Sequence, residues 1–218
     1  MQDTVPQPAV LSVAATTHGR VLVRRPAAQS ARGILVGFHG YMENAAAQLT
    51  RLEQIPGSEA WTLLSIQALH RFYRGRSQEV VASWMTREDR ETAIVDNVDY
   101  VRAAIAAIGG ALTPVVYAGF SQGVAMAFRA AQHAECPAAG VVGVGGDVPP
   151  ELLGDGALRF SRALLARGAA DEWYTAAKLN ADVAALRARG VDVQEFVYDG
   201  GHEWTPAVAA AAAGWLQT

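Results

Sequence analysis

Apolar and polar positions along the chain follow two alternating patterns. Short, nearly continuous apolar runs are typical of buried strands, and they alternate with longer segments whose apolar residues recur every three or four positions, as on one face of a helix. This alternation predicts an α/β fold with a mostly parallel sheet and helices on both faces. We predict strands at 33–40, 61–66, 115–120, 141–144, 163–166 and 193–197, and helices at 45–55, directly after 121, at about 174–189 and after Pro206.

One long helix is expected between the second and third of these strands. Thr86 is the predicted N-cap, acidic residues follow in the first turn, and a Gly109-Gly110 pair ends the helix. Its apolar positions at helical spacing are Ile94, Val95, Val98, Val101, Ile105 and Ile108. The segment up to Arg25 is predicted to add one or two antiparallel edge strands, of which 21–23 is the clearer.

Length and charge narrow the class of protein. A chain of 218 residues suits one α/β domain, 1–218, with a single core. The net charge of -3 and the scattered arginines indicate no nucleic-acid partner. The single cysteine, Cys136, cannot form an internal disulfide, and no secretory leader pattern is seen, so we expect a cytoplasmic protein. Every apolar run is interrupted well before about 18 residues, which predicts no membrane span.

The most informative segment is the pentapeptide Gly119-Phe120-Ser121-Gln122-Gly123. It lies between a β-branched apolar run and an alanine-rich helix pattern, which is the context of a nucleophile elbow. In such an elbow the flanking glycines let strand and helix pass closely, and the serine hydroxyl is exposed at the turn. The pattern therefore predicts that Ser121 is a nucleophile.

A serine needs a base to take its proton, and the base needs an orienting group. Among five histidines, His202 is the candidate because it follows a predicted strand near the carboxyl edge of the sheet, where α/β active sites lie. In the chain order nucleophile, acid, histidine, Asp171 fits best as the acid, since it follows the strand at 163–166. The neighbouring Glu172 is its main rival.

Attack on a carbonyl also requires donors for the developing oxyanion. The elbow supplies the backbone amide of Gln122. The second donor is predicted to be the amide of Tyr41, in the loop that follows the strand at 33–40. The adjacent His39 is interpreted as a structural loop histidine.

These residues resemble those of the phospholipase/carboxylesterase group of α/β-hydrolases, which includes the acyl-protein thioesterases. The resemblance runs from Gly33 to the C-terminus and implies an α/β-hydrolase fold, with Tyr41 and Gln122 as oxyanion donors. A chain of this length leaves little room for a lid domain, so we expect a minimal lid or none. The thioesterases typically read His-Gly-Leu-Gly-Asp where this chain reads His-Gly-Tyr-Met-Glu at 39–43, which favours simple carboxylesters over acyl-proteins. The stretches 68–73 and 83–87 resemble the region beside the family's acyl site. Tyr73, Trp84 and Met85 are therefore candidate substrate-binding residues, and a core role for them is equally compatible with the pattern.

The sequence thus predicts a serine carboxylester hydrolase that works through an acyl-enzyme on a small-molecule ester. No cofactor is expected, and the histidines are too dispersed for a metal site. A thioesterase or an acyltransferase would use the same residues, and a catalytically silent fold that binds small hydrophobic ligands is the alternative from another class. The loop at 67–83 is the one candidate cover for the site. No oligomeric state is predicted.

Overall fold

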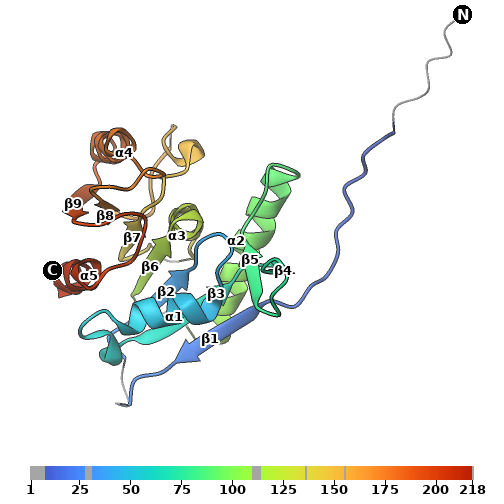
Figure 1. Ribbon diagram of the computed structural model, residues 1–218, viewed down its shortest axis with the longest axis horizontal. Helices are drawn as coiled ribbons and strands as arrows, with labels where there is room; N and C mark the ends of the chain where they lie inside the picture. Colours follow the sequence, from blue (N-terminus) through green and yellow to red (C-terminus); the bar gives the residue numbers. More distant parts are fainter. Residues whose placement is uncertain (1–7, 28–30, 110–113, 136, 155, 218) are drawn as a thin grey trace, which may run out of the picture.

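A seven-stranded sheet forms the centre of the molecule (Figure 1). The computed structural model describes residues 8–27, 31–109, 114–135, 137–154 and 156–217. The strand order is β1-β3-β2-β6-β7-β8-β9, in which β1 pairs antiparallel with β3 and all other neighbours are parallel. The strands are β1 (Arg20–Arg24), β2 (Ile34–Phe38), β3 (Thr62–Gln67), β6 (Val115–Phe120), β7 (Gly140–Val144), β8 (Arg162–Gly168) and β9 (Asp192–Tyr198). The predicted α/β class is confirmed, with one edge strand before β2 among the described residues.

Helices cover both faces of this sheet (Figure 1). Residues of α2, α3 and α4 share one core cluster with every second residue of β2, such as Val36. The intervening Leu35 packs in a second cluster, together with residues of α1 and α5. The helices are α1 (Ala45–Glu53), α2 (Arg90–Ala107), α3 (Gln122–Gln132), α4 (Ala176–Ala188) and α5 (Pro206–Gln217), and short 3-10 turns lie at Ser58–Ala60 and Pro150–Leu152. None of the helices in the described part of the chain combines the length and the apolar character needed to cross a membrane.

The start of α2 differs from the prediction. The helix begins at Arg90, four residues after the expected N-cap Thr86, and its N-cap is Asp89 in a left-handed conformation with φ 48°. The Thr86 hydroxyl instead accepts a hydrogen bond from the amide of Glu88 at 3.2 Å, so it stabilises a local turn. Val95, expected on the apolar face, is 58% exposed. Gly109 follows the helix with φ 81°, as a C-terminal glycine should, and Gly110 lies outside the described residues.

The segment at 67–83 is not the loop that we expected. It contains a two-stranded antiparallel hairpin of β4 (His70–Tyr73) and β5 (Val80–Ser83). An isolated bridge joins Ala82 of β5 to Glu43, in the loop after β2. The hairpin is therefore anchored beside the carboxyl end of the central strands.

Candidate active site

Ser121 occupies a strained turn between β6 and α3. Its φ of 53° and ψ of -123° are rare for a residue with a side chain. The Ser121 amide donates to the carbonyl of Val144 at 2.9 Å, and the Ser121 carbonyl accepts from the amide of Val124 at 2.9 Å. These two bonds hold the strained residue between the sheet and the first turn of the helix.

The glycines on either side of Ser121 are required by close backbone approach. A Cβ atom added at Gly119 would lie 2.3 Å from the carbonyl oxygen of Gly123. One added at Gly123 would lie 2.2 Å from the carbonyl oxygen of Phe38, at the end of β2. Both positions thus have room only for hydrogen, which is the steric requirement of the predicted elbow.

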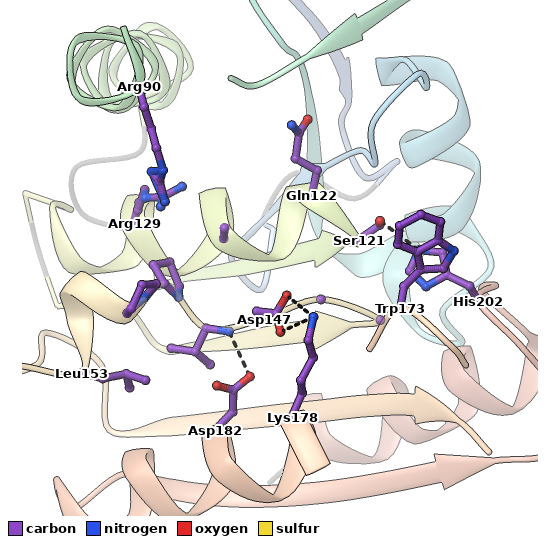
Figure 2. A pocket seen from close by; sticks show the side chains of 16 residues that line it. Arg90, Ser121, Gln122, Arg129, Asp147, Leu153, Trp173, Lys178, Asp182 and His202 are labelled. Atoms are coloured by element: carbon purple, nitrogen blue, oxygen red, sulfur yellow. Dashed lines mark hydrogen bonds and ion pairs between the residues drawn. The ribbon is translucent and has the colours of Figure 1, made fainter. Parts of the chain in front are cut away.

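The structure brings the side chains of Ser121, His202 and Asp171 together. The Nε2 atom of His202 lies 2.9 Å from Oγ of Ser121, and its Nδ1 atom lies 2.9 Å from Oδ2 of Asp171. The three residues come from loops after β6, β9 and β8, which end at the same edge of the sheet. Figure 2 shows the histidine directed at the serine hydroxyl. In this arrangement one ring nitrogen can take the serine proton while the other stays bonded to the carboxylate.

Asp171 is held in place by its own loop. Its side chain is fully buried, and Oδ1 accepts hydrogen bonds from the amides of Trp173 and Tyr174, both at 2.9 Å. The other oxygen, Oδ2, is left for His202. The rival acid, Glu172, is exposed on the same loop and forms no described hydrogen bond with the histidine.

The two predicted oxyanion donors lie at the ends of neighbouring strands. Tyr41 follows β2, and Gln122 is the first residue of α3, where the amide has no acceptor within the helix. Within the described residues no hydrogen bond is formed by the Tyr41 amide either. Both amides are thus available to a ligand.

His39, beside these donors, has both ring nitrogens engaged. Nδ1 donates to the carbonyl of Gly40 at 2.7 Å, and Nε2 accepts from the amide of Ala68 at 3.1 Å. Burial lowers the pKa of His39 below its ordinary value, so the ring is held neutral in one tautomer. Its position is that of a structural residue that shapes the loop.

A cavity of about 610 Å³ opens beside Ser121 and His202 (Figure 2). It extends along α3, and none of the three predicted substrate-binding residues lines it. Trp84 is completely buried, because its ring packs on Phe38 and its indole N–H donates to the carbonyl of His39. Tyr73 is 61% exposed on the β4–β5 hairpin, and the sulfur of Met85 accepts a hydrogen bond at 3.5 Å from Nη1 of Arg129, a residue that lines the cavity. The three predicted substrate-binding residues therefore lie outside this cavity, which is lined mainly by residues of α3 and of the loop after β7.

No metal centre is seen in the part of the chain that the structure describes. A group of three or more His, Cys, Asp or Glu side chains close enough to hold an ion does not occur there.

Comparisons with solved structures identify the fold. No protein-family model and no curated protein matches the sequence. An acyl-protein thioesterase 2 from Zea mays superposes with a TM-score of 0.71 at 20% identity, over 92% of this chain and 98% of the other. This chain has the α/β-hydrolase fold. A carboxylesterase from Bacillus cereus (TM-score 0.69, 18% identity, 91% and 93% covered) and a phospholipase/carboxylesterase from Dyadobacter fermentans (0.70, 17%, 95% and 100%) are similar to it as well. These structures belong to the group that the sequence resembles.

Within this α/β-hydrolase fold, the loop after β2 is clamped by an ion pair that sequence reasoning missed. Both carboxylate oxygens of Glu43 accept from Arg51 on α1, at 2.5 and 2.6 Å, and Oε2 also accepts from the amide of Gly40 at 2.7 Å. Burial opposes the charge of Glu43, but the bonds from Arg51 outweigh it and lower the pKa of the carboxyl group. The guanidinium lies 4.1 Å from the ring centroid of Phe120, and that ring is 5.1 Å from the ring of His202. The Glu43–Arg51 ion pair is thus linked to His202, the proposed base, by the contacts that both make with the ring of Phe120.

The side chain of Gln122 forms a second fastening that the sequence did not indicate. Its Nε2 donates to the carbonyl of Met85 at 3.0 Å, and its Oε1 accepts from the amide of Trp84 at 3.0 Å. The amide group therefore binds segment 83–85 to the start of α3. Neither the Glu43–Arg51 ion pair nor the hydrogen bonds of the Gln122 side chain could be predicted from the sequence, because no recognisable sequence pattern pairs these side chains with their partners.

Proposed function

We propose that this protein is a serine carboxylester hydrolase that forms an acyl-enzyme. The observation that carries the proposal is the relay from Ser121 through His202 to Asp171, with both hydrogen-bond distances at 2.9 Å. A serine hydroxyl is a weak nucleophile until a base accepts its proton, and the relay supplies that base in a fixed orientation.

Ser121 Oγ attacks the ester carbonyl carbon, while Nε2 of His202 takes the hydroxyl proton. The amides of Tyr41 and Gln122 donate to the oxyanion of the tetrahedral intermediate. When the intermediate collapses, the carbon–oxygen bond to the alcohol breaks and His202 returns the proton to the leaving oxygen. Water then attacks the acyl-enzyme by the same route and releases the acid. Throughout, Asp171 stabilises the imidazolium without taking its proton.

An active-site probe separates this proposal from a silent ligand-binding fold. A fluorophosphonate should label the purified protein at Ser121, and the protein should hydrolyse a short aryl ester. The variant Ser121→Ala should do neither. Absence of labelling together with absence of turnover would leave the fold as a binder.

A thioesterase is the second candidate, because the same three side chains would cleave a thioester. Competition between an oxygen ester and a thioester of the same acyl chain in one assay compares the two. We expect the oxygen ester to be cleaved with the higher kcat/KM, since the loop sequence at 39–43 departs from the thioesterase pattern.

A further inference from the structure

Two arginines meet at the end of the cavity far from Ser121 and His202 (Figure 2). Arg90 is the first residue of α2, and Arg129 lies on α3. Both guanidinium groups face one carboxylate, that of Glu151 in the short turn at Pro150–Leu152. This end of the cavity therefore carries two positive charges and one negative charge.

The two arginines share Glu151 unequally. Nε and Nη2 of Arg129 lie 2.7 and 2.6 Å from Oε1 of Glu151, and the Arg129 side chain is only 2% exposed. Arg90 reaches no closer than 4.0 Å to Oε2, and its other near contact is the sulfur of Met85 at 3.7 Å. Its side chain is 41% exposed. Among the described residues, Arg90 therefore donates no hydrogen bond to an oxygen.

The other charged groups of the cavity are engaged with partners. Lys178 and Asp147 form an ion pair at 3.2 Å across from the arginines. Oδ2 of Asp182 accepts from the amide of Val148 at 3.0 Å and from the hydroxyl of Tyr174 at 2.9 Å, and burial raises the pKa of this carboxyl group. The positive charge without a close partner is thus that of Arg90.

Helix α3 runs along the cavity and gives the approximate distance between Ser121 and the end where the two arginines lie. Ser121, Ala125 and Arg129 all line the cavity at intervals of four residues, so about 12 Å along the helix separates the two ends. Long side chains lean toward the helix N-terminus, which brings the guanidinium group of Arg129 on α3 somewhat closer to the serine. Val148, Pro150 and Leu153 line the same cavity and offer apolar contact to a chain between the ends.

We propose that the preferred ester carries an acyl chain that ends in a carboxylate, bound by Arg90 while Ser121 attacks the ester at the other end. This inference rests on the proposed function and names its substrate class. A carboxylate fits because the site has one positive charge in excess, which matches a single negative charge rather than the nearly two charges of a phosphate. Guanidinium groups bind carboxylates through paired N–H donors, and a partly desolvated site strengthens such bonds.

Matched substrates test the assignment. Aryl monoesters of straight-chain dicarboxylic acids with six, eight and ten carbons are compared with the aryl alkanoates of the same lengths, and the readout is the ratio of kcat/KM within each pair. We expect the ratio to favour the acid-ended ester by ~10-fold at its best length, the effect of one charged hydrogen bond at a half-exposed site. Arg90→Met should bring the ratio to parity, and Arg90→Lys should retain part of it.

Arg102→Met is the matched control, since Arg102 lies on the same helix, is similarly exposed and does not line this cavity. It should keep the wild-type ratio. A ratio at or below one in the wild type, or one that Arg90→Met leaves unchanged, overturns the assignment.

A binding measurement separates failure of this inference from failure of the proposed chemistry. In Ser121→Ala, calorimetry with monomethyl octanedioate and with methyl octanoate measures recognition without turnover. Tighter binding of monomethyl octanedioate that is lost in the Ser121→Ala, Arg90→Met double variant supports the site even if no ester is hydrolysed. Equal binding of the two esters overturns it, whatever the hydrolysis assay shows.

Discussion

The close approach of α3 to the end of β2 makes Gly123 a sensitive test of the site. In Gly123→Ala the added methyl group would lie 2.2 Å from the Phe38 carbonyl oxygen and 2.7 Å from that of His39, whereas an ordinary contact starts at 3.4 Å. Both obstacles are backbone atoms, so no side chain can turn away. The helix and the strand must therefore separate by about 1 Å, which is in the range where overpacking costs about 1–3 kcal/mol of unfolding free energy.

The same displacement should impair catalysis beyond its effect on stability. Tyr41 follows the displaced end of β2 and Gln122 starts the displaced helix, so the two proposed oxyanion donors move apart. A shift of about 1 Å in such groups can lower the rate by ~100-fold. We therefore expect Gly123→Ala to unfold at lower urea concentration and to show a correspondingly lower kcat on a short aryl ester at temperatures where it remains folded.

Gly214→Ala serves as the control. Gly214 lies exposed on α5 with no atom within 4 Å of the added Cβ, so this variant should keep its activity and gain up to ~1 kcal/mol from the better helix propensity of alanine. If Gly123→Ala unfolded at the wild-type urea concentration and hydrolysed esters at the wild-type rate, the argument from backbone contact would be refuted.

Three further changes test other parts of the site. Ser121→Ala should lower ester hydrolysis by ~10³-fold or more without loss of stability, and near-wild-type turnover of the pure variant would reject the nucleophile. Asp171→Asn should lower kcat by ~10⁴-fold, since an amide stabilises the wrong histidine tautomer, while Glu172→Gln should do much less; the reverse order would make Glu172 the acid. Glu43 has a lowered pKa in the folded protein, so its ion pair with Arg51 adds stability above the ordinary glutamate pKa that is lost as the pH falls. Urea unfolding from pH 6 to 3 should therefore show a shallower decline in Glu43→Gln, and parallel curves would contradict that coupling.

The sequence was sufficient to predict that the three proposed catalytic side chains lie at one edge of the sheet. Ser121, Asp171 and His202 each follow an apolar run that is a buried strand, and the carboxyl ends of parallel strands share an edge. Gly119 and Gly123, on either side of Ser121, also indicated that strand and helix pass closely at this turn. Strand β6 has the predicted bounds of 115–120, because Pro114 precedes it and the elbow serine, Ser121, follows it.

The cavity wall could not be predicted in the same way, because it depends on packing between distant segments. Trp84 is an aromatic residue in a mixed stretch, and only the positions of Phe38 and His39 decide that it is buried. Arg90 and Arg129 lie 39 positions apart and meet only because α2 packs beside α3. Thr86 illustrates a local ambiguity, since its hydroxyl stabilises a turn as readily as a helix start.

The β4–β5 hairpin is a position at which this fold could accept an inserted segment. Its base is fixed by the Glu43–Ala82 bridge and by the hydrogen bonds of Gln122 to segment 83–85, whereas residues 75–78 at the tip are exposed. Lengthening an exposed tip adds only a slowly rising loop-closure entropy and leaves the anchored base unchanged. A cap inserted there, by evolution or by design, would lie beside the loop that carries Tyr41 and would restrict which substrates can enter without altering the proposed catalytic residues.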